Sequence, residues 1–316
     1  MALATNTLAT YEAIGNREDL SDVIYRIDPT DTPFLSSLDK EKATAVNHEW
    51  QSQALAAAAA NAALEGEDAQ ATNVVTPTVR LGNISQISTK IARVTGTQQV
   101  VQHAGRDDEL AYQEMLKGLE LKRDMELILS GINQAKNAGN DTTARLTASA
   151  LSWIKSNTSK GAAGSDPAAA DGTGTRTDGT QRVFTEALLK TVLNAIWTAG
   201  GKPDTIMVGA FNKQVFSTFT GRSTPMEQAS QKKITAAVTV YESDFGTLKV
   251  VANRFSRARD ALVLQMDMWA IAYVRNMVSL ELAKTGDSER RQILSEYALV
   301  SRNEKASGGV FDLTTA

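Results

Sequence analysis

Apolar residues recur at helical spacing along two stretches of the chain. The longer stretch, 107–132, opens on three acidic residues, which the positive end of a helix dipole favours. At a rise of 1.5 Å per residue it predicts a spine-like helix about 39 Å long. The second stretch, 185–198, starts on a threonine suited to cap a helix and is followed by the helix stop Gly200-Gly201. Trp197 falls in its apolar pattern, so we expect a core position for that side chain.

Strand patterns fill the C-terminal part of the chain. Short runs rich in apolar residues predict strands over 238–241, 248–251, 260–264, 269–274, 277–282 and 291–300. The first two flank Asp244-Phe245-Gly246, which predicts a hairpin turn. Residues 83–101 also have strand composition. Helices and strands in this order predict an α+β fold.

The first 45 residues read as an extended arm with one short helix over 16–26. Phe34, Leu35 and Leu38 follow that helix as apolar anchors. An arm of this kind has little to bury by itself, so we expect it to lie on another subunit or along its own core.

Residues 46–81 predict a hairpin-like excursion with poor burial of its own. Its outgoing strand alternates polar and apolar positions, an alanine run follows at 54–63, and Pro77 interrupts the returning strand. A neighbouring copy would order such a segment, and the alternative is a flexible linker. Trp50 lies in this excursion, where its burial would need a partner, so we expect an interface hot spot there.

Residues 133–178 are polar and rich in glycine and alanine, with one short element around 151–154. Turn residues dominate 165–180, which predicts a surface loop. The sequence Gly172-Thr173-Gly174-Thr175 lacks the preceding strand and following helix start of a phosphate loop.

The overall charge does not suggest a protein that coats DNA. The formal net charge is −3, whereas such a protein usually carries a basic surplus. The basic pairs Lys122-Arg123, Lys232-Lys233 and Arg290-Arg291 are scattered, and we interpret them as solvated or ion-paired, with DNA contact as the minor alternative. The N-terminus lacks the basic and apolar regions of a secretion signal. The sequence also lacks an apolar run long enough to predict a membrane span.

No constellation of residues points to chemistry. The chain has no cysteine, and its two histidines, His48 and His103, lie in different segments without a ligand set. Asp244, Asp260 and Asp267 are more typical of turn caps than of a carboxylate cluster. We therefore predict no catalytic residue, no cofactor and no metal site.

Charges of both signs alternate over 281–305, which indicates either a salt-bridged surface or charge pairing between subunits. The candidate interface residues of the whole chain are Trp50, Glu65, Glu67, Asp68, Arg290, Arg291, Arg302 and Glu304.

Several continuous segments resemble the major capsid proteins of tailed double-stranded-DNA bacteriophages. They are DELAY at 108–112, LKRDMELIL at 121–129, YESDFGTLKVV at 241–251, ELAKTGDSERRQIL at 281–294 and RNEKASGG at 302–309. HEWQ at 48–51 and Leu64-Glu65-Gly66 also fit, and the resemblance is weakest over 133–182. The resemblance implies the Hong Kong-type capsid fold.

In that fold the segments would be the N-terminal arm (1–45), the E-loop (46–82), the P-domain strand and spine helix (83–135), a region that is mostly A-domain with a surface loop (136–240), and strands of both domains with the C-terminus (241–316). The implied function is self-assembly into hexamers and pentamers of an icosahedral head that encloses double-stranded DNA. The implied partners are further copies, a separate scaffolding protein, a portal, a decoration protein and non-specifically bound DNA, without a membrane. The implied location is the virion, after assembly in the bacterial host's cytoplasm.

Two departures from family patterns can be stated. Some members cross-link their shell from an E-loop lysine, but no lysine lies between Lys42 and Lys90, so we expect no such bond. Only about 45 residues precede the excursion, so we expect no fused scaffold segment and hence a separate scaffolding protein. Two rival functions are an encapsulin-like cellular nanocompartment shell and an α/β enzyme with its cleft in 183–219, where no convergent polar set is found.

Overall fold

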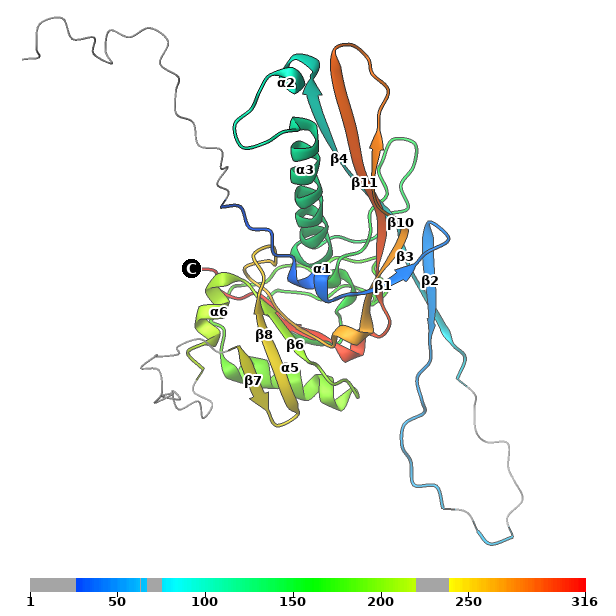
Figure 1. Ribbon diagram of the computed structural model, residues 1–316. Helices are drawn as coiled ribbons and strands as arrows, with labels where there is room; N and C mark the ends of the chain where they lie inside the picture. The colour runs from blue at the N-terminus through cyan, green and yellow to red at the C-terminus, as the bar shows by residue number, and fades with distance from the viewer. Residues whose placement is uncertain (1–26, 63, 67–75, 220–238) are drawn as a thin grey trace, which may run out of the picture.

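The helix predicted at 107–132 forms the spine of the molecule. The computed structural model describes residues 27–62, 64–66, 76–219 and 239–316 (Figure 1). Helix α3 (Glu109–Glu126) is capped by Asp108, whose carboxylate accepts a hydrogen bond from the amide of Ala111 at 3.0 Å. It continues as one π-helical turn over Leu127–Gly131, so the predicted helix is confirmed with a wider last turn.

A four-stranded sheet lies beside this helix in the order β1-β10-β11-β4. Its strands are β1 (Asp39–Lys42), β10 (Trp269–Glu281), β11 (Ser288–Ser301) and β4 (Gln86–Thr95). The two strands predicted at 269–274 and 277–282 are wrong as separate elements. They form the single strand β10, whose pairing with β11 shifts register on either side of Arg275. Extra residues in one strand bend it without ending it, so the sequence pattern mimics a break.

A six-stranded sheet forms the second half of the body, in the order β5-β12-β9-β6-β8-β7. Its strands are β5 (Asn157–Ser159), β12 (Gly308–Val310), β9 (Ala261–Leu264), β6 (Thr205–Val208), β8 (Gly246–Ala252) and β7 (Val240–Ser243). Helices α5 (Glu186–Thr198) and α6 (Ala210–Phe216) pack on it through a buried apolar cluster that includes Leu189, Ile206 and Phe216. The predicted turn at 244–246 is confirmed, because β7 and β8 pair antiparallel up to Ser243 and Gly246.

The arm is anchored on the chain's own core. Phe34 and Leu35 in α1 (Pro33–Ser37), together with Leu38, are buried in the cluster that also holds Leu121 and Met125 of α3. Strand β1 then pairs in parallel with the start of β10. Of the two expected placements of the arm, its own core is therefore correct from α1 through β1. The helix predicted at 16–26 lies outside the described residues.

The excursion is confirmed as an antiparallel pair. Strands β2 (Asn47–Ser52) and β3 (Val79–Ile84) pair along their whole length. Beyond the pair, residues 53–62 and 76–78 have no regular structure and are exposed, so the alanine run is not helical over 54–62. Figure 1 shows this part running away from the body, on the side opposite to the tip formed by β4, β11 and α2 (Gly96–Val100).

Candidate assembly surfaces

The described part of the excursion carries strongly exposed apolar side chains. Leu55 is 97% exposed and Leu64 is 79% exposed, and the alanines between 54 and 62 are exposed as well. A solvated leucine forgoes about 1.5–3 kcal/mol of stabilisation that burial would provide. Glu65 is exposed near the far end of the excursion, whereas Glu67 and Asp68 lie outside the described residues.

Trp50 is held by the chain itself. Its ring lies 5.4 Å from the ring of Trp153, which is fully buried on helix α4 (Ala150–Trp153). Trp50 is therefore partly buried without a partner subunit, and its role as an interface hot spot stays a prediction. The sequence separation of more than one hundred residues hides this contact from pattern analysis.

The four-stranded sheet, called the tip sheet from here on, has one face that the described residues leave open. On β4, Lys90 forms an ion pair with Asp124 of α3 at 2.7 Å, so side-chain alternation places Ile87 and Ile91 on the opposite face. Strand register aligns Val278 and Leu280 of β10 with that same face. These four apolar side chains are all exposed. The 138–145 loop and Ile87 line a pocket of about 350 Å³ at one end of the face.

The candidate charged residues have partners within the chain. Arg291 pairs with Glu114 of α3 at 2.5 Å, and Arg290 donates to the carbonyl of Ala283 at 2.8 Å and to a threonine hydroxyl. Arg291 therefore belongs to a salt bridge within the subunit. This agrees with the salt-bridged surface, one of the two alternatives predicted for this region.

Arg302 and Glu304 fasten separate segments to the end of β11. Arg302 pairs with Glu41 and, at 3.3 Å, with Asp39, which holds β1 of the arm. Glu304 accepts hydrogen bonds from the amide and hydroxyl of Ser156, at 3.2 and 2.5 Å. Both side chains thus stabilise the subunit itself.

The prediction that Trp197 lies in the core is wrong. Its side chain is 57% exposed and stacks on Phe245 of the β7–β8 turn, with ring centroids 5.3 Å apart. It lies in the last turn of α5, where the preceding residue, Ile196, is the one buried in the apolar cluster.

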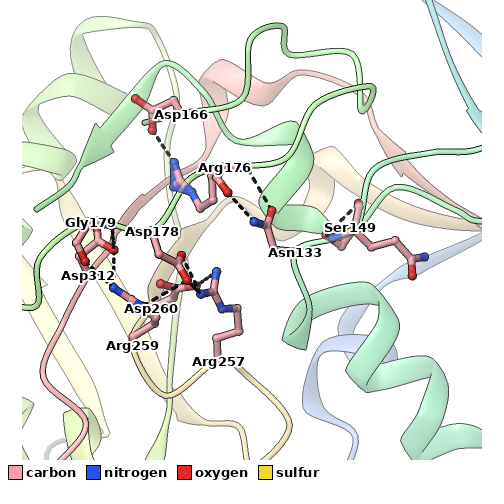
Figure 2. Close-up of polar contacts among 11 residues, drawn as sticks. Asn133, Ser149, Asp166, Arg176, Asp178, Gly179, Arg257, Arg259, Asp260 and Asp312 are labelled. Carbon is pink, nitrogen blue, oxygen red and sulfur yellow. Dashed lines mark hydrogen bonds and ion pairs between the residues drawn. The ribbon is translucent and has the colours of Figure 1, made fainter. Parts of the chain in front are cut away.

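A cluster of arginines and aspartates was missed by the sequence patterns (Figure 2). Arg257 bonds Asp178 at 2.7 and 2.6 Å, and Arg259 bonds Asp312 at 2.8 Å. Its members come from the 166–178 loop, the 257–260 turn and the C-terminal segment, so only the tertiary fold brings them together. The loop predicted to lie on the surface is in part buried, because Arg176 is 5% exposed and stacks on Phe311 at 3.3 Å.

The remaining chemical candidates stay apart. Asp260 is buried in the cluster, whereas Asp244 and Asp267 are exposed on other elements, so the three carboxylates do not converge. His48 lies 3.7 Å from Glu41, and His103 bonds Gln98 at 2.8 Å. Over residues 27–62, 64–66, 76–219 and 239–316, no three His, Cys, Asp or Glu side chains gather as a metal site requires. No helix in that same part of the chain is long and apolar enough to cross a bilayer.

Comparison with known proteins gives a consistent picture. A family model described as SU10 major capsid protein matches residues 4–314. The chain is 29% identical over 349 residues to the major capsid protein of Escherichia phage Phieco32, and the alignment covers 98% of each protein.

Solved structures resemble the fold at low sequence identity. A chain in the structure of Gordonia phage Cozz matches with a TM-score of 0.63 at 11% identity, covering 99% of this chain and 98% of that one. A chain of Mycobacterium phage Cain matches with a TM-score of 0.60 at 14% identity, covering 98% and 100%. A structure of phage G major capsid and decoration proteins matches with a TM-score of 0.53 at 9% identity, covering 99% and 100%.

Proposed function

The chain belongs to the family of SU10 major capsid proteins, and from this premise we propose that its copies form the hexamers and pentamers of an icosahedral phage head. It is a structural protein of the virion with the Hong Kong-type α+β capsid fold, and it is not an enzyme. The family supports this phage capsid function over an encapsulin-like shell.

The observation that carries the hexamer and pentamer proposal is the uncovered excursion. Residues 53–62 are extended and exposed, and they include the almost fully exposed Leu55. Ordering an extended segment costs conformational entropy that its own contacts do not offset. A neighbouring copy would supply the missing apolar contacts, so we assign 46–82 the role of the E-loop.

The open face of the tip sheet is the surface that suits this segment best. It offers Ile87, Ile91 and Leu280 as exposed apolar contacts. Arg93 and Arg290 pair across β4 and β11 on the same face, and their guanidinium groups bond a serine hydroxyl and a backbone carbonyl. The excursion carries the acidic sequence Glu65-Gly66-Glu67-Asp68 after its apolar run. Apolar contact with complementary charge would set the register between copies.

The other segments take the roles that the family resemblance implies. We assign 1–45 to the N-terminal arm and 83–135 to the P-domain strand and spine helix. Residues 136–240 would be mostly A-domain, at the centres of the capsomers. Residues 241–316 would supply strands to both domains, and the P-domains would meet where capsomers join.

Several partners follow from the same proposal. They are a separate scaffolding protein, a portal, a decoration protein, and packaged DNA bound without sequence preference, with assembly in the host cytoplasm. Similar structures include a phage G capsid with decoration proteins and a P4 procapsid with a size determination protein. The absence of lysine between Lys42 and Lys90 supports a shell without covalent cross-links from the excursion.

Removal of the excursion tests the proposal. Ser52 and Val79 are paired at the end of the β2–β3 ladder, so an Asn-Gly turn can replace residues 53–78 and leave the ladder intact. We expect the full chain to form closed shells by negative-stain electron microscopy, and the shortened chain to keep its circular dichroism spectrum but form none. Shells from the shortened chain at the yield of the full chain would overturn the proposed role of the excursion.

A further inference from the structure

The glycine-rich loop between β5 and α5 is closed at its base by one buried residue. Asp312 accepts hydrogen bonds from the amide of Gly161 at 3.0 Å and from the amide of Gly179 at 2.7 Å. It has a φ of +62° and is 2% exposed. The loop therefore returns to its starting point on a carboxylate of the C-terminal segment, like an Ω-loop.

Two guanidinium groups, those of Arg257 and Arg259, hold this loop to the rest of the body. Arg257 donates to both carboxylate oxygens of Asp178, and Arg259 donates to Asp312 and to the carbonyl of Gly179 at 2.7 Å. Arg176 of the loop pairs with Asp166, so the loop is also braced internally. Figure 2 shows Arg257 and Arg259 beside Asp178 and Asp312, with the Arg176–Asp166 pair next to this group.

Asp260 is the carboxylate in this cluster that the arginines leave without a hydrogen bond at Oδ2. Asp260 is 1% exposed, and Nη1 of Arg257 lies 3.3 Å from its Oδ2 without hydrogen-bond geometry. Each arginine that faces it is already bonded to another aspartate. A buried carboxylate without a hydrogen bond favours its neutral form.

The other charges around the cluster lie at its edges. Lys160 pairs with Asp166. Arg182 donates a hydrogen bond to Ser159 of β5 and attracts Asp312 electrostatically. Burial raises the pKa of Asp260 to about 6, against the attraction of Arg257 and Arg176. Burial alone would raise the pKa of Asp178, but its contacts with the arginines outweigh burial, and the pKa is lowered.

We propose that Asp260 is a protonation-controlled clamp on the 161–179 loop. With Asp260 neutral, Arg257 is fully available to Asp178 and the loop is held tightly. With Asp260 ionised, two carboxylates compete for Arg257 inside a buried site, and the loop opens more often. Opening would uncover Trp153, since a Cβ built on Gly172 would lie only 3.1 Å from its ring.

The direction of the pH dependence follows from the sign of the shift. A carboxyl whose folded pKa is raised stabilises the closed state at low pH, and this stabilisation is lost as the pH rises through the folded value. Taking the ordinary value of 3.8 for the open loop and about 6 for the closed loop, the opening equilibrium rises about tenfold between pH 5 and pH 8. The lowered pKa of Asp178 acts only below its ordinary value of 3.8, outside this window.

Hydrogen exchange on the full-length chain tests the clamp. Amide protection of 161–179 is measured at pH 5 and pH 8, corrected for intrinsic exchange, in the wild type, Asp260→Asn and Asp178→Asn. We expect protection in the wild type to fall about tenfold towards pH 8. Asp260→Asn should show, at pH 5 and at pH 8, the amide protection that the wild type has at pH 5. Asp178→Asn should show lower amide protection than the wild type at both pH values.

Two results would overturn the clamp. One is a wild-type protection that stays constant or rises with pH. The other is an Asp260→Asn chain that keeps the wild-type pH response, judged at matched circular dichroism. Neither result depends on shell formation, so a failure of the clamp is distinct from a failure of the proposed assembly.

Discussion

Glu126 offers a stringent test of how the arm is attached. Its carboxylate lies at the C-terminal end of α3, is fully buried, and accepts hydrogen bonds from the amides of Phe34 and Leu35 at 2.9 and 2.7 Å. It also accepts one from the side-chain amide of Asn253 at 2.6 Å. A residue 92 positions from Phe34 thus caps the first turn of α1, where Thr32 makes no side-chain cap.

Glu126→Ala leaves three buried donors without an acceptor. Each unsatisfied donor costs about 1–3 kcal/mol, and the variant also escapes the cost of burying a charge. We expect a net loss of about 3–5 kcal/mol in the free energy of unfolding. Glu126→Gln keeps one acceptor oxygen, so we expect a smaller loss of about 1–3 kcal/mol.

The assay is urea unfolding of the unassembled subunit, followed by circular dichroism at fixed pH. Glu120→Gln is the matched control, because Glu120 lies on the same helix in a partly exposed pair with Lys117 and should cost less than about 1 kcal/mol. An Ala variant of Glu126 with the midpoint of this control would refute the reasoning.

The pH dependence supplies a second readout for the same residue. Burial raises the pKa of Glu126, against the hydrogen bonds from Leu35, Phe34 and Asn253. A raised folded pKa means that the contribution to stability is present at low pH and is lost as the pH rises through that value. Glu126→Gln should remove this component, and an unchanged pH profile would contradict the assignment.

Three further outcomes test the packing and the excursion. Gly172→Ala should destabilise the subunit by about 1–3 kcal/mol in urea unfolding, because Gly172 has a φ of +77° and an added Cβ would lie 2.8 Å from Ala148. Gly118→Ala, in open space on α3, should instead stabilise by up to about 1 kcal/mol, and equal effects would contradict the packing. Trp50→Ala should lower the stability of the unassembled subunit by about 1–3 kcal/mol through its contact with Trp153, whereas a loss seen only in assembly would make it purely an interface residue. Leu55→Asp should reduce the shell yield measured by light scattering but change the free energy of subunit unfolding by less than about 0.5 kcal/mol. Asn61→Asp is the control for the added charge. A normal shell yield from Leu55→Asp would argue against contact of Leu55 with a neighbouring copy.

Elements with strong local signals were predictable from the sequence. The acidic start and helical spacing of α3, and the turn between β7 and β8, depend on neighbours a few residues away. Helix α5 was also predicted, but the exposure of Trp197 depends on tertiary packing that the helical pattern does not contain.

Distant partners explain the rest. Trp50 reads as exposed until Trp153 is placed beside it, and Arg176 reads as a loop residue until Asp166 and Phe311 enclose it. Asp260 reads as a turn cap, whereas the fold buries it among arginines from two segments. Spacing in a sequence carries no information on such pairs.

The measurement that tests the central claim most directly is cryo-electron microscopy of the expressed full-length chain. The account predicts closed shells in which residues 53–62 of each copy lie against another copy, with Leu55 covered. Isolated subunits that fold the same segment onto their own body, without any assembly, would contradict it.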